Sequence, residues 1–289
     1  MIKTLSHMLN IVILLMISTT VEAAITCTRP TSTGISTAFA TGGIFPNVTQ
    51  GTATFSCTRG NAGDPTSVYF RANNGRNGTG TQNRAKSGSN FINYELYKDS
   101  SCSSIWSNAN NTSNMFLVPL NTTVGIAQPQ TINFWGCVLA DPSVPAGTYT
   151  DRVNMRVRNN TNSGNLSRGR NMNVSITNNA NCAITSVANV VFGTYIAFRA
   201  TPLVSPAANI VMNCTTDLPY TMTLDATSGV IAGLNYTLTI NTLTPPVDAR
   251  GAGVGQIHSL VGTMPADQAG DCSMGSCFSS QIRTLTVTY

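Results

Sequence analysis

Short stretches in which apolar and polar residues alternate recur along the whole chain. Clear examples are TATFSC (52–57), FINYELY (91–97), ANIVMNC (208–214) and GLNYTLTI (233–240). Strict alternation is typical of a β-strand with one face in a core, and no stretch shows the sustained 3.6-residue period of an amphipathic helix. Gly, Asn, Pro and Ser separate these stretches at short intervals, which favours β-sandwiches. The pattern therefore predicts an all-β protein.

The two halves of the chain repeat one another. Cys27 and Cys57 are about 30 residues apart, and Cys182 and Cys214 have a similar spacing; in both halves the second cysteine ends an alternating strand. Each half closes with another alternating strand, which contains Val153, Met155 and Val157 in the first half and Leu285, Val287 and Tyr289 in the second. We therefore expect a first domain at 24–158, a linker at 159–179 and a second domain at 180–289.

The first 23 residues have the features of a secretory signal peptide. Lys3 provides the positive charge, Leu9 to Ile17 form a short apolar core, and Val21 and Ala23 are small residues before a cleavage site. The apolar run is too short to span a bilayer. We expect residues 1–23 to be removed and the mature chain to be exported.

Charge and composition narrow the possible partners. Only 9% of the 289 residues are charged, and the net charge is +5. Residues 24–179 contain twelve Lys and Arg against five Asp and Glu, whereas residues 180–289 contain three Arg against five Asp. The basic first half is compatible with attraction to anionic surfaces or with scattered solubilising charge. We do not expect a nucleic-acid partner for an exported chain rich in Asn and Thr.

The eight cysteines all lie in the exported part, where an even number indicates disulfides. Four cysteines in each half allow three connectivities per half, and the repeat favours one cysteine pair around the first strands and a second pair later in each half. A metal site is not expected, because the mature chain has one histidine, His258, and only the last two cysteines are at zinc-ligand spacing. The expected pairs are Cys27–Cys57, Cys102–Cys137, Cys182–Cys214 and Cys272–Cys277.

Catalysis is not expected. The single mature histidine and the pairing of all cysteines disfavour Ser-His-Asp and Cys-His sites. Glu95 is the only mature glutamate, and it lies in a regular strand. We expect no enzyme activity, no cofactor and no metal; a secreted enzyme remains a remote alternative.

Several motifs, in this order and in two copies, resemble the spore coat protein U (SCPU) domain. They are VVFGTY (190–195) between two cysteines, INYELY (92–97) followed by Trp106, AGTYTDRVNMRV (146–157), and the terminal TLTVTY (284–289). The chain departs from this pattern at AFATGG in the first copy and at the Cys272–Cys277 loop in the second. The resemblance implies subunits of archaic, Csu-type chaperone–usher pili, built as immunoglobulin-like sandwiches that lack their last strand.

In such subunits the missing strand is first supplied by a periplasmic chaperone and then by the next pilin subunit, with assembly at an outer-membrane usher. The resemblance therefore implies that the strand of Leu285, Val287 and Tyr289 borders an open groove. Few residues precede Cys27, so we expect this subunit to accept a strand but not to donate one, and to sit at the tip of the pilus on the cell surface.

The segment 171–177 has the alternation of a donor strand, with Met172, Val174 and Ile176 on one face. We expect it to complete the first domain within the same chain. The alternative is that it forms the first strand of the second domain.

The expected function is a tip adhesin that mediates surface attachment and biofilm formation; the alternative is a non-adhesive structural pilus or coat subunit. Exposed apolar residues on loops suit contact with an abiotic or host surface. The candidate contacts are Ile44, Phe45, Trp106, Met115 and Phe116, although burial in a core is the alternative for each. If these fail, the basic segment 71–90, with Arg71, Arg76, Arg84 and Lys86, is the next candidate.

Overall fold

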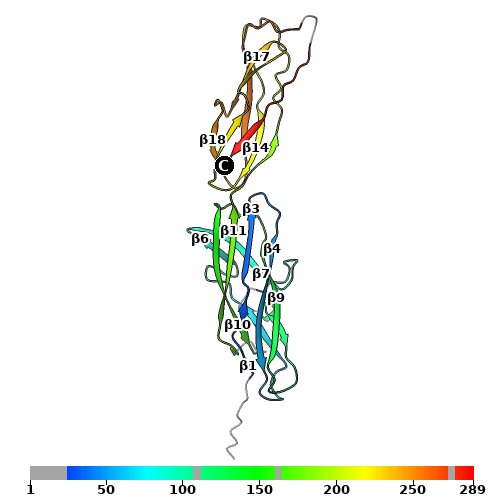
Figure 1. Ribbon diagram of the computed structural model, residues 1–289, viewed down its shortest axis with the longest axis vertical. Coiled ribbons are helices and arrows are strands. Elements are labelled where there is room, and N and C mark those ends of the chain that lie inside the picture. The colour runs from blue at the N-terminus through cyan, green and yellow to red at the C-terminus, as the bar shows by residue number, and fades with distance from the viewer. Residues whose placement is uncertain (1–24, 107–111, 160–163, 273–276) are drawn as a thin grey trace, which may run out of the picture.

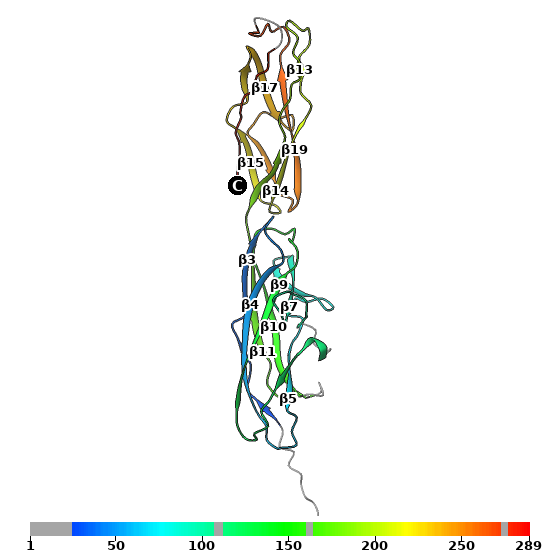
Figure 2. The ribbon, with the colours of Figure 1, turned by 90° about the vertical axis from the view of Figure 1, so that its right-hand side faces the viewer.

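A computed structural model describes residues 25–106, 112–159, 164–272 and 277–289. The predicted signal peptide at 1–23 lies outside the described residues. The fold is all-β, as predicted, and the one helical element among the described residues is a short 3-10 helix, η2 (Thr112–Asn114). No helix in this part of the chain has the length and apolar character of a membrane span. Figures 1 and 2 show two elongated lobes stacked end to end.

The first lobe comprises residues 25–179, and its strands form one sheet in the order β1-β4-β9-β7-β6-β10-β11-β3. In addition, β2 pairs with β4, and β5 pairs with β10 and β8. The strands are β1 (Thr26–Cys27), β2 (Thr31–Ser32), β3 (Ile35–Ala40), β4 (Asn47–Thr58), β5 (Ser67–Ala72), β6 (Asn83–Ser87), β7 (Asn90–Tyr97), β8 (Phe116–Pro119), β9 (Gln128–Val138), β10 (Gly147–Arg158) and β11 (Arg170–Asn179).

The core of the first lobe is built from the inward residues of these alternating strands. Aromatic rings lie at its centre: the Trp106 ring centroid is 5.1 Å from that of Phe70 and 4.8 Å from that of Phe134. The indole N–H of Trp106 donates a hydrogen bond to the Phe70 carbonyl at 3.0 Å, so the polar atom of this ring is satisfied within the core.

Strand β11 lies inside this sheet. It pairs antiparallel with β10 over nine residues, from Gly147↔Asn178 to Met155↔Arg170, and parallel with β3 on its other side. Met172, Val174 and Ile176 are fully buried and belong to the core of the first lobe. The structure thus places the alternating segment 171–177 in the first lobe.

The second lobe comprises residues 182–288 in two sheets. One has the order β12-β14-β19-β17-β16, with β13 paired to β19, and the other has the order β18-β15-β20. The strands are β12 (Cys182–Val187), β13 (Leu203–Val204), β14 (Ala208–Cys214), β15 (Pro219–Leu224), β16 (Ser228–Ile231), β17 (Leu234–Ile240), β18 (Val247–Arg250), β19 (Gly255–Met264) and β20 (Leu285–Thr288).

Both lobes carry two disulfides. Cys27–Cys57 joins β1 to β4, and Cys182–Cys214 joins β12 to β14 at the equivalent place. The other two bridges are Cys102–Cys137 and Cys272–Cys277. These four pairs are the ones favoured by the repeat.

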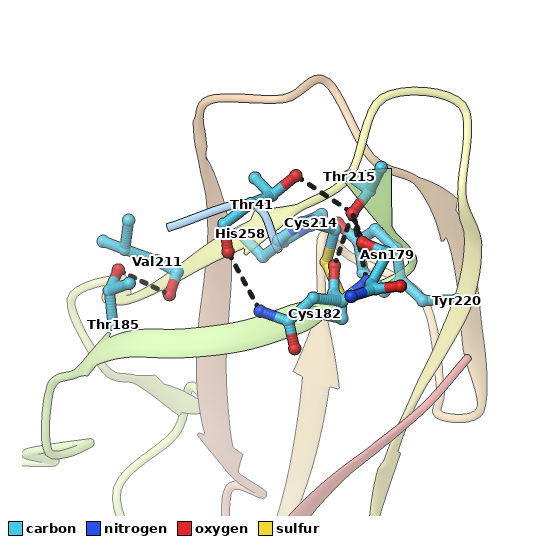
Figure 3. Close-up of a disulfide and its surroundings, with 10 residues drawn as sticks. Thr41, Asn179, Cys182, Thr185, Val211, Cys214, Thr215, Tyr220 and His258 are labelled. Carbon is cyan, nitrogen blue, oxygen red and sulfur yellow. Dashed lines mark hydrogen bonds between the residues drawn. A yellow bond between two sulfur atoms is a disulfide. The ribbon is translucent and has the colours of Figure 1, made fainter. Parts of the chain in front are cut away.

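Direct hydrogen bonds connect the two lobes (Figure 3). The buried hydroxyl of Thr215 accepts a hydrogen bond from the Thr41 hydroxyl at 3.0 Å and another from the Asn181 backbone N–H at 3.0 Å. The side-chain amide of Asn181 donates to the Thr41 carbonyl at 3.0 Å. Pro145 of the first lobe also forms an isolated parallel bridge with Thr216. The end of β3 therefore marks the junction end of the first lobe.

Candidate functional site

The two lobes differ at the strand that closes each repeat. In the first lobe β10 is flanked by β11 on one side and by β5 and β6 on the other. Among the described residues, β20 pairs with β15 alone. One edge of β20 therefore lacks the neighbour that β11 provides for β10.

Burial follows this difference in pairing. Val153, Met155 and Val157 of β10 are completely buried. In the corresponding strand, Leu285 and Val287 are only half-buried, and Tyr289 is 57% exposed. Side chains with the alternation of a core strand are thus left partly in water, which makes this edge a candidate binding surface.

The segment after the first cysteine shows the same contrast. In the first lobe this segment is β3, which pairs along β11. In the second lobe the equivalent residues, 190–195, are not assigned to a strand. Val190, Phe192 and Tyr195 pack only partly against the core, as Leu285 and Val287 do. In the first lobe the corresponding elements, β10 and β3, flank β11 on its two sides.

Two of the predicted tip contacts are buried, and the prediction for them is wrong. Trp106 is 0% exposed, and Met115 is also buried. Trp106 fills the centre of the first core because burial of a large ring stabilises more than its exposure on a loop. Phe116 belongs to strand β8 and lies partly buried 5.3 Å from the Trp106 ring, so it is a packing residue as well.

The loop that carries the other two candidates, Ile44 and Phe45, lies at the junction end of the first lobe and not at the end expected to face outward. Ile44 is 92% exposed, as the prediction requires, but Phe45 is partly buried and packs edge-on against Phe39 at 5.3 Å. This loop follows Thr41, which contacts Thr215 and Asn181 of the second lobe. Ile44 therefore lies beside the junction and not at the far end of the first lobe.

The far end includes two loops that the sequence analysis did not single out. They connect β4 to β5 (59–66) and β8 to β9 (120–127), and we call them the far-end loops. The pairing Cys57↔Gln128 places both at the end of β4 remote from the junction. The second loop exposes Ile126 (55%) and Val124 (39%). Both are isolated apolar residues in a polar segment, which is a signal in the sequence, but the sequence does not say to which end of the lobe they belong.

Arg59 holds the far-end loops together. Its side chain is only 4% exposed and donates to the carbonyls of Thr122 at 2.9 Å and Asn121 at 3.3 Å in one loop. It also donates to the carbonyls of Ala62 at 2.7 Å and Asp64 at 2.6 Å in the other loop. The Arg59 carbonyl accepts from the Gly125 N–H at 2.8 Å, between Val124 and Ile126. Hydrogen bonds from a buried guanidinium to four carbonyls give these loops a defined shape.

The basic segment 71–90 is not a single loop. Arg71 lies near the end of β5, and Arg84 and Lys86 lie on β6. The connection between them is anchored to the buried Asp151 carboxylate, which accepts from the Arg76 N–H at 2.9 Å and from the Tyr94 hydroxyl at 2.8 Å. Burial, together with the charge of Asp151, raises the pKa of Tyr94 well above its usual value.

Among the described residues, no group of three or more His, Cys, Asp or Glu side chains is gathered in a way that could hold a metal ion. The one described histidine, His258, is buried between the Tyr220 hydroxyl at 2.7 Å and the Asn241 amide at 2.8 Å. Burial lowers the pKa of His258 below its usual value. These contacts make His258 part of the packing of the second lobe.

Solved structures with a similar fold include components of pili. One is the CsuC–CsuE chaperone–tip adhesion subunit pre-assembly complex from archaic chaperone–usher Csu pili of Acinetobacter baumannii, with 14% identity and a TM-score of 0.44 over 90% of this chain and 100% of that chain. Another is the CupB6 tip adhesin from Pseudomonas aeruginosa, with 11% identity and a TM-score of 0.34 over 92% of this chain and 95% of that one.

Comparison with curated proteins finds no match. The family model of the Spore Coat Protein U domain matches residues 14–156 and 169–241. These matches cover more than half of the chain and extend into both lobes. The chain therefore belongs to the Spore Coat Protein U domain family.

Proposed function

We propose that this protein is the tip subunit of an archaic chaperone–usher pilus and attaches the fibre to a surface. The observation that carries the proposal is the contrast between the two closing strands. Strand β10 is covered by β11, whereas in the described part of the chain β20 pairs on one side only and leaves Leu285 and Val287 half-buried. An uncovered strand edge beside partly exposed apolar side chains accepts an added strand.

In this proposal the second lobe is an incomplete immunoglobulin-like sandwich. A periplasmic chaperone covers its open edge before assembly, and a strand from the next pilin subunit covers it in the fibre, after passage through the outer-membrane usher. Alternate apolar side chains of the added strand fill the space between β20 and residues 190–195.

The first lobe, by contrast, is completed by its own chain. Strand β11 lies where the donor strand of a neighbouring subunit is proposed to lie in the second lobe, and its Met172, Val174 and Ile176 are buried in the first core. A lobe that needs no external strand is free to project from the fibre.

The far-end loops are then the surface that faces outward on the first lobe. Val124 and Ile126 are exposed there on a loop fixed by Arg59. Apolar side chains held in a fixed position lose little entropy on contact, and burial of each contributes roughly 1.5–3 kcal/mol. Many fibres on one cell add their contacts together.

Attachment of cells that carry variant fibres tests the proposal. Replacement of Val124 and Ile126 by Ser should reduce attachment to an abiotic hydrophobic surface while the number of fibres, counted by electron microscopy, stays the same. The matched control is Ile44→Ser, which removes a more exposed apolar side chain at the junction end and should leave attachment unchanged.

Two outcomes oppose the proposal. Unchanged attachment of the double variant, with a normal number of fibres, favours a non-adhesive structural pilus or coat subunit. Loss of fibres in the double variant shows that Val124 and Ile126 serve folding or assembly instead of attachment.

A further inference from the structure

One outward face of the first lobe gathers basic side chains. Along β10 the inward residues Val153, Met155 and Val157 are buried, so the alternate residues Arg152, Arg156 and Arg158 point to the other face. On the neighbouring strand β5, Arg71 pairs directly with Arg156. We call Arg71, Arg152, Arg156 and Arg158 the basic face; β5, β10 and β11 can be followed along the lower lobe in Figure 2.

The arginines are close enough to affect one another. Burial lowers the pKa of the Arg71 guanidinium, and the positive charges of Arg158 and Arg156 lower it further. Like charges placed opposite one another on a sheet destabilise it. Uncharged polar residues also occupy outward positions of this strand, since β10 has Thr148, Thr150 and Asn154 there.

The basic character continues onto β6. Lys86 lies next to β10, opposite Thr150, and the Lys86 ammonium and Arg84 guanidinium both lie over the Phe91 ring, at 5.5 Å and 4.3 Å from its centroid. Cation–π contacts hold these two charges on the outer surface without neutralising them.

The carboxylates of the same lobe accept hydrogen bonds from nearby groups. Glu95 of β7, which borders β6, accepts from the Asn83 N–H at 3.1 Å, and Asp99 accepts from the Ser104 N–H at 2.7 Å. Asp151 of β10 points into the lobe, toward the Tyr94 hydroxyl. Asp64 accepts from the Gly60 and Asn61 N–H groups of a far-end loop, and Asp141 accepts from the Gly42 N–H near the junction. The strands that carry the basic face, β5, β10 and β11, supply no outward carboxylate.

We propose that the basic face binds an acidic polysaccharide. Guanidinium groups bind carboxylate and sulfate groups with two parallel hydrogen bonds. Along β10 the spacing is roughly 7 Å between Arg156 and Arg158 and roughly 13 Å between Arg152 and Arg156, which suits a polymer with repeated charges. Outward amides on the adjacent strand, Asn171 and Asn173, are suited to hydrogen bonds with sugar hydroxyls.

This binding face is on the flank of the first lobe and is distinct from the far-end loops. A subunit with both surfaces attaches to apolar surfaces through the far-end loops and to acidic polysaccharides through the basic face. The inference about the flank does not depend on the proposed function of the far end.

Binding is tested in solution with the full mature chain and fluorescein-labelled polysaccharides, followed by fluorescence anisotropy. The probes are alginate oligomers for carboxylate, dextran sulfate for sulfate and neutral dextran as the uncharged control. We expect binding to at least one acidic probe, none to neutral dextran, and an affinity that falls as the salt concentration rises.

The variant Arg152→Gln/Arg156→Gln should weaken binding of the acidic probe about tenfold, as expected for the loss of two charge-assisted contacts. The matched control, Lys98→Gln/Arg199→Gln, removes the same charge elsewhere and should leave the affinity within about twofold. Tryptophan fluorescence of both variants checks that the first lobe remains folded.

Three results overturn the proposal. They are the absence of binding to both acidic probes, an equal loss of affinity in the two double variants, and tighter binding of a DNA duplex than of either polysaccharide at the same salt concentration. The last result assigns the face to nucleic acid.

Discussion

Replacement of Ile176 by Ala tests whether β11 is an integral part of the first lobe. Ile176 is 1% exposed, pairs with Tyr149 of β10 and Thr37 of β3, and belongs to the first core. Truncation of a buried isoleucine to alanine costs about 2–5 kcal/mol, because the lost contacts leave a cavity. With a loss of about 3 kcal/mol and an m-value of about 2 kcal/mol per molar urea, the unfolding midpoint should fall by about 1.5 M.

Tryptophan fluorescence reports on this lobe selectively. The chain has two tryptophans, and both Trp106 and Trp135 lie in the first lobe. Urea unfolding of the full mature chain, followed at the tryptophan emission, therefore measures the stability of the lobe that β11 is expected to complete. The matched control is Asn173→Ala, an outward and exposed position of the same strand, which should move the midpoint by less than about 0.3 M.

The alternative position of β11, as the first strand of the second domain, gives a different result. In that case Ile176→Ala leaves the tryptophan transition where it is in the unsubstituted chain. A midpoint that moves no more in Ile176→Ala than in Asn173→Ala would refute the placement of β11 in the first core.

Three further predictions concern the junction, the far end and the response to pH. Thr215→Val removes the acceptor shared by Thr41 and Asn181 and should lower the stability of the full chain by about 1–3 kcal/mol in urea unfolding; no change would show that the bonds between the lobes are dispensable. Arg59→Met should speed hydrogen exchange of the Gly125 amide at least about tenfold, because both far-end loops lose their shared donor; unchanged exchange would mean that the loops hold their shape without it. Burial raises the pKa of Tyr94 above 10.0, so its stabilisation is present below about pH 10 and is lost as the pH rises through the folded-state pKa. Tyr94→Phe should therefore flatten the fall in urea midpoint above about pH 10, and an equally steep fall in the variant contradicts this origin.

The strands and the disulfides could be predicted because their signals are local or repeated. Alternation along β4, β7, β10 and β14 reflects a core on one side of each strand, and this pattern depends only on neighbouring residues. The similar spacing of the first cysteine pairs in the two halves, 30 and 32 residues, identified the same bridge twice. Strand β11 was recognisable for the same reason, since its three apolar residues alternate without interruption.

The surface proposed to contact a target could not be predicted, because exposure depends on tertiary packing. Trp106 and Met115 lie in an Asn- and Ser-rich stretch, yet Trp106 fills the first core and Met115 is buried. Ile44 is exposed, but its position beside the junction follows from hydrogen bonds between residues 174 positions apart in the chain. Val124 and Ile126 could be assigned to the far end only once the pairing of β4 with β9 was known.

The open edge of β20 is tested most directly by supplying the strand that it lacks. A copy of RNMNVSITNN, the sequence of β11, is fused through a flexible linker after Tyr289. The control fusion carries Asp at the positions of Met172, Val174 and Ile176. Thermal unfolding of the second lobe is followed in both fusions by hydrogen exchange of the β20 amides as temperature rises.

We predict that the apolar strand protects β20 and raises its unfolding temperature, while the Asp-substituted strand does neither, because three buried side chains contribute roughly 1.5–3 kcal/mol each. Equal protection of β20 in the two fusions, or protection in neither, would contradict the proposal that the second lobe accepts a donor strand.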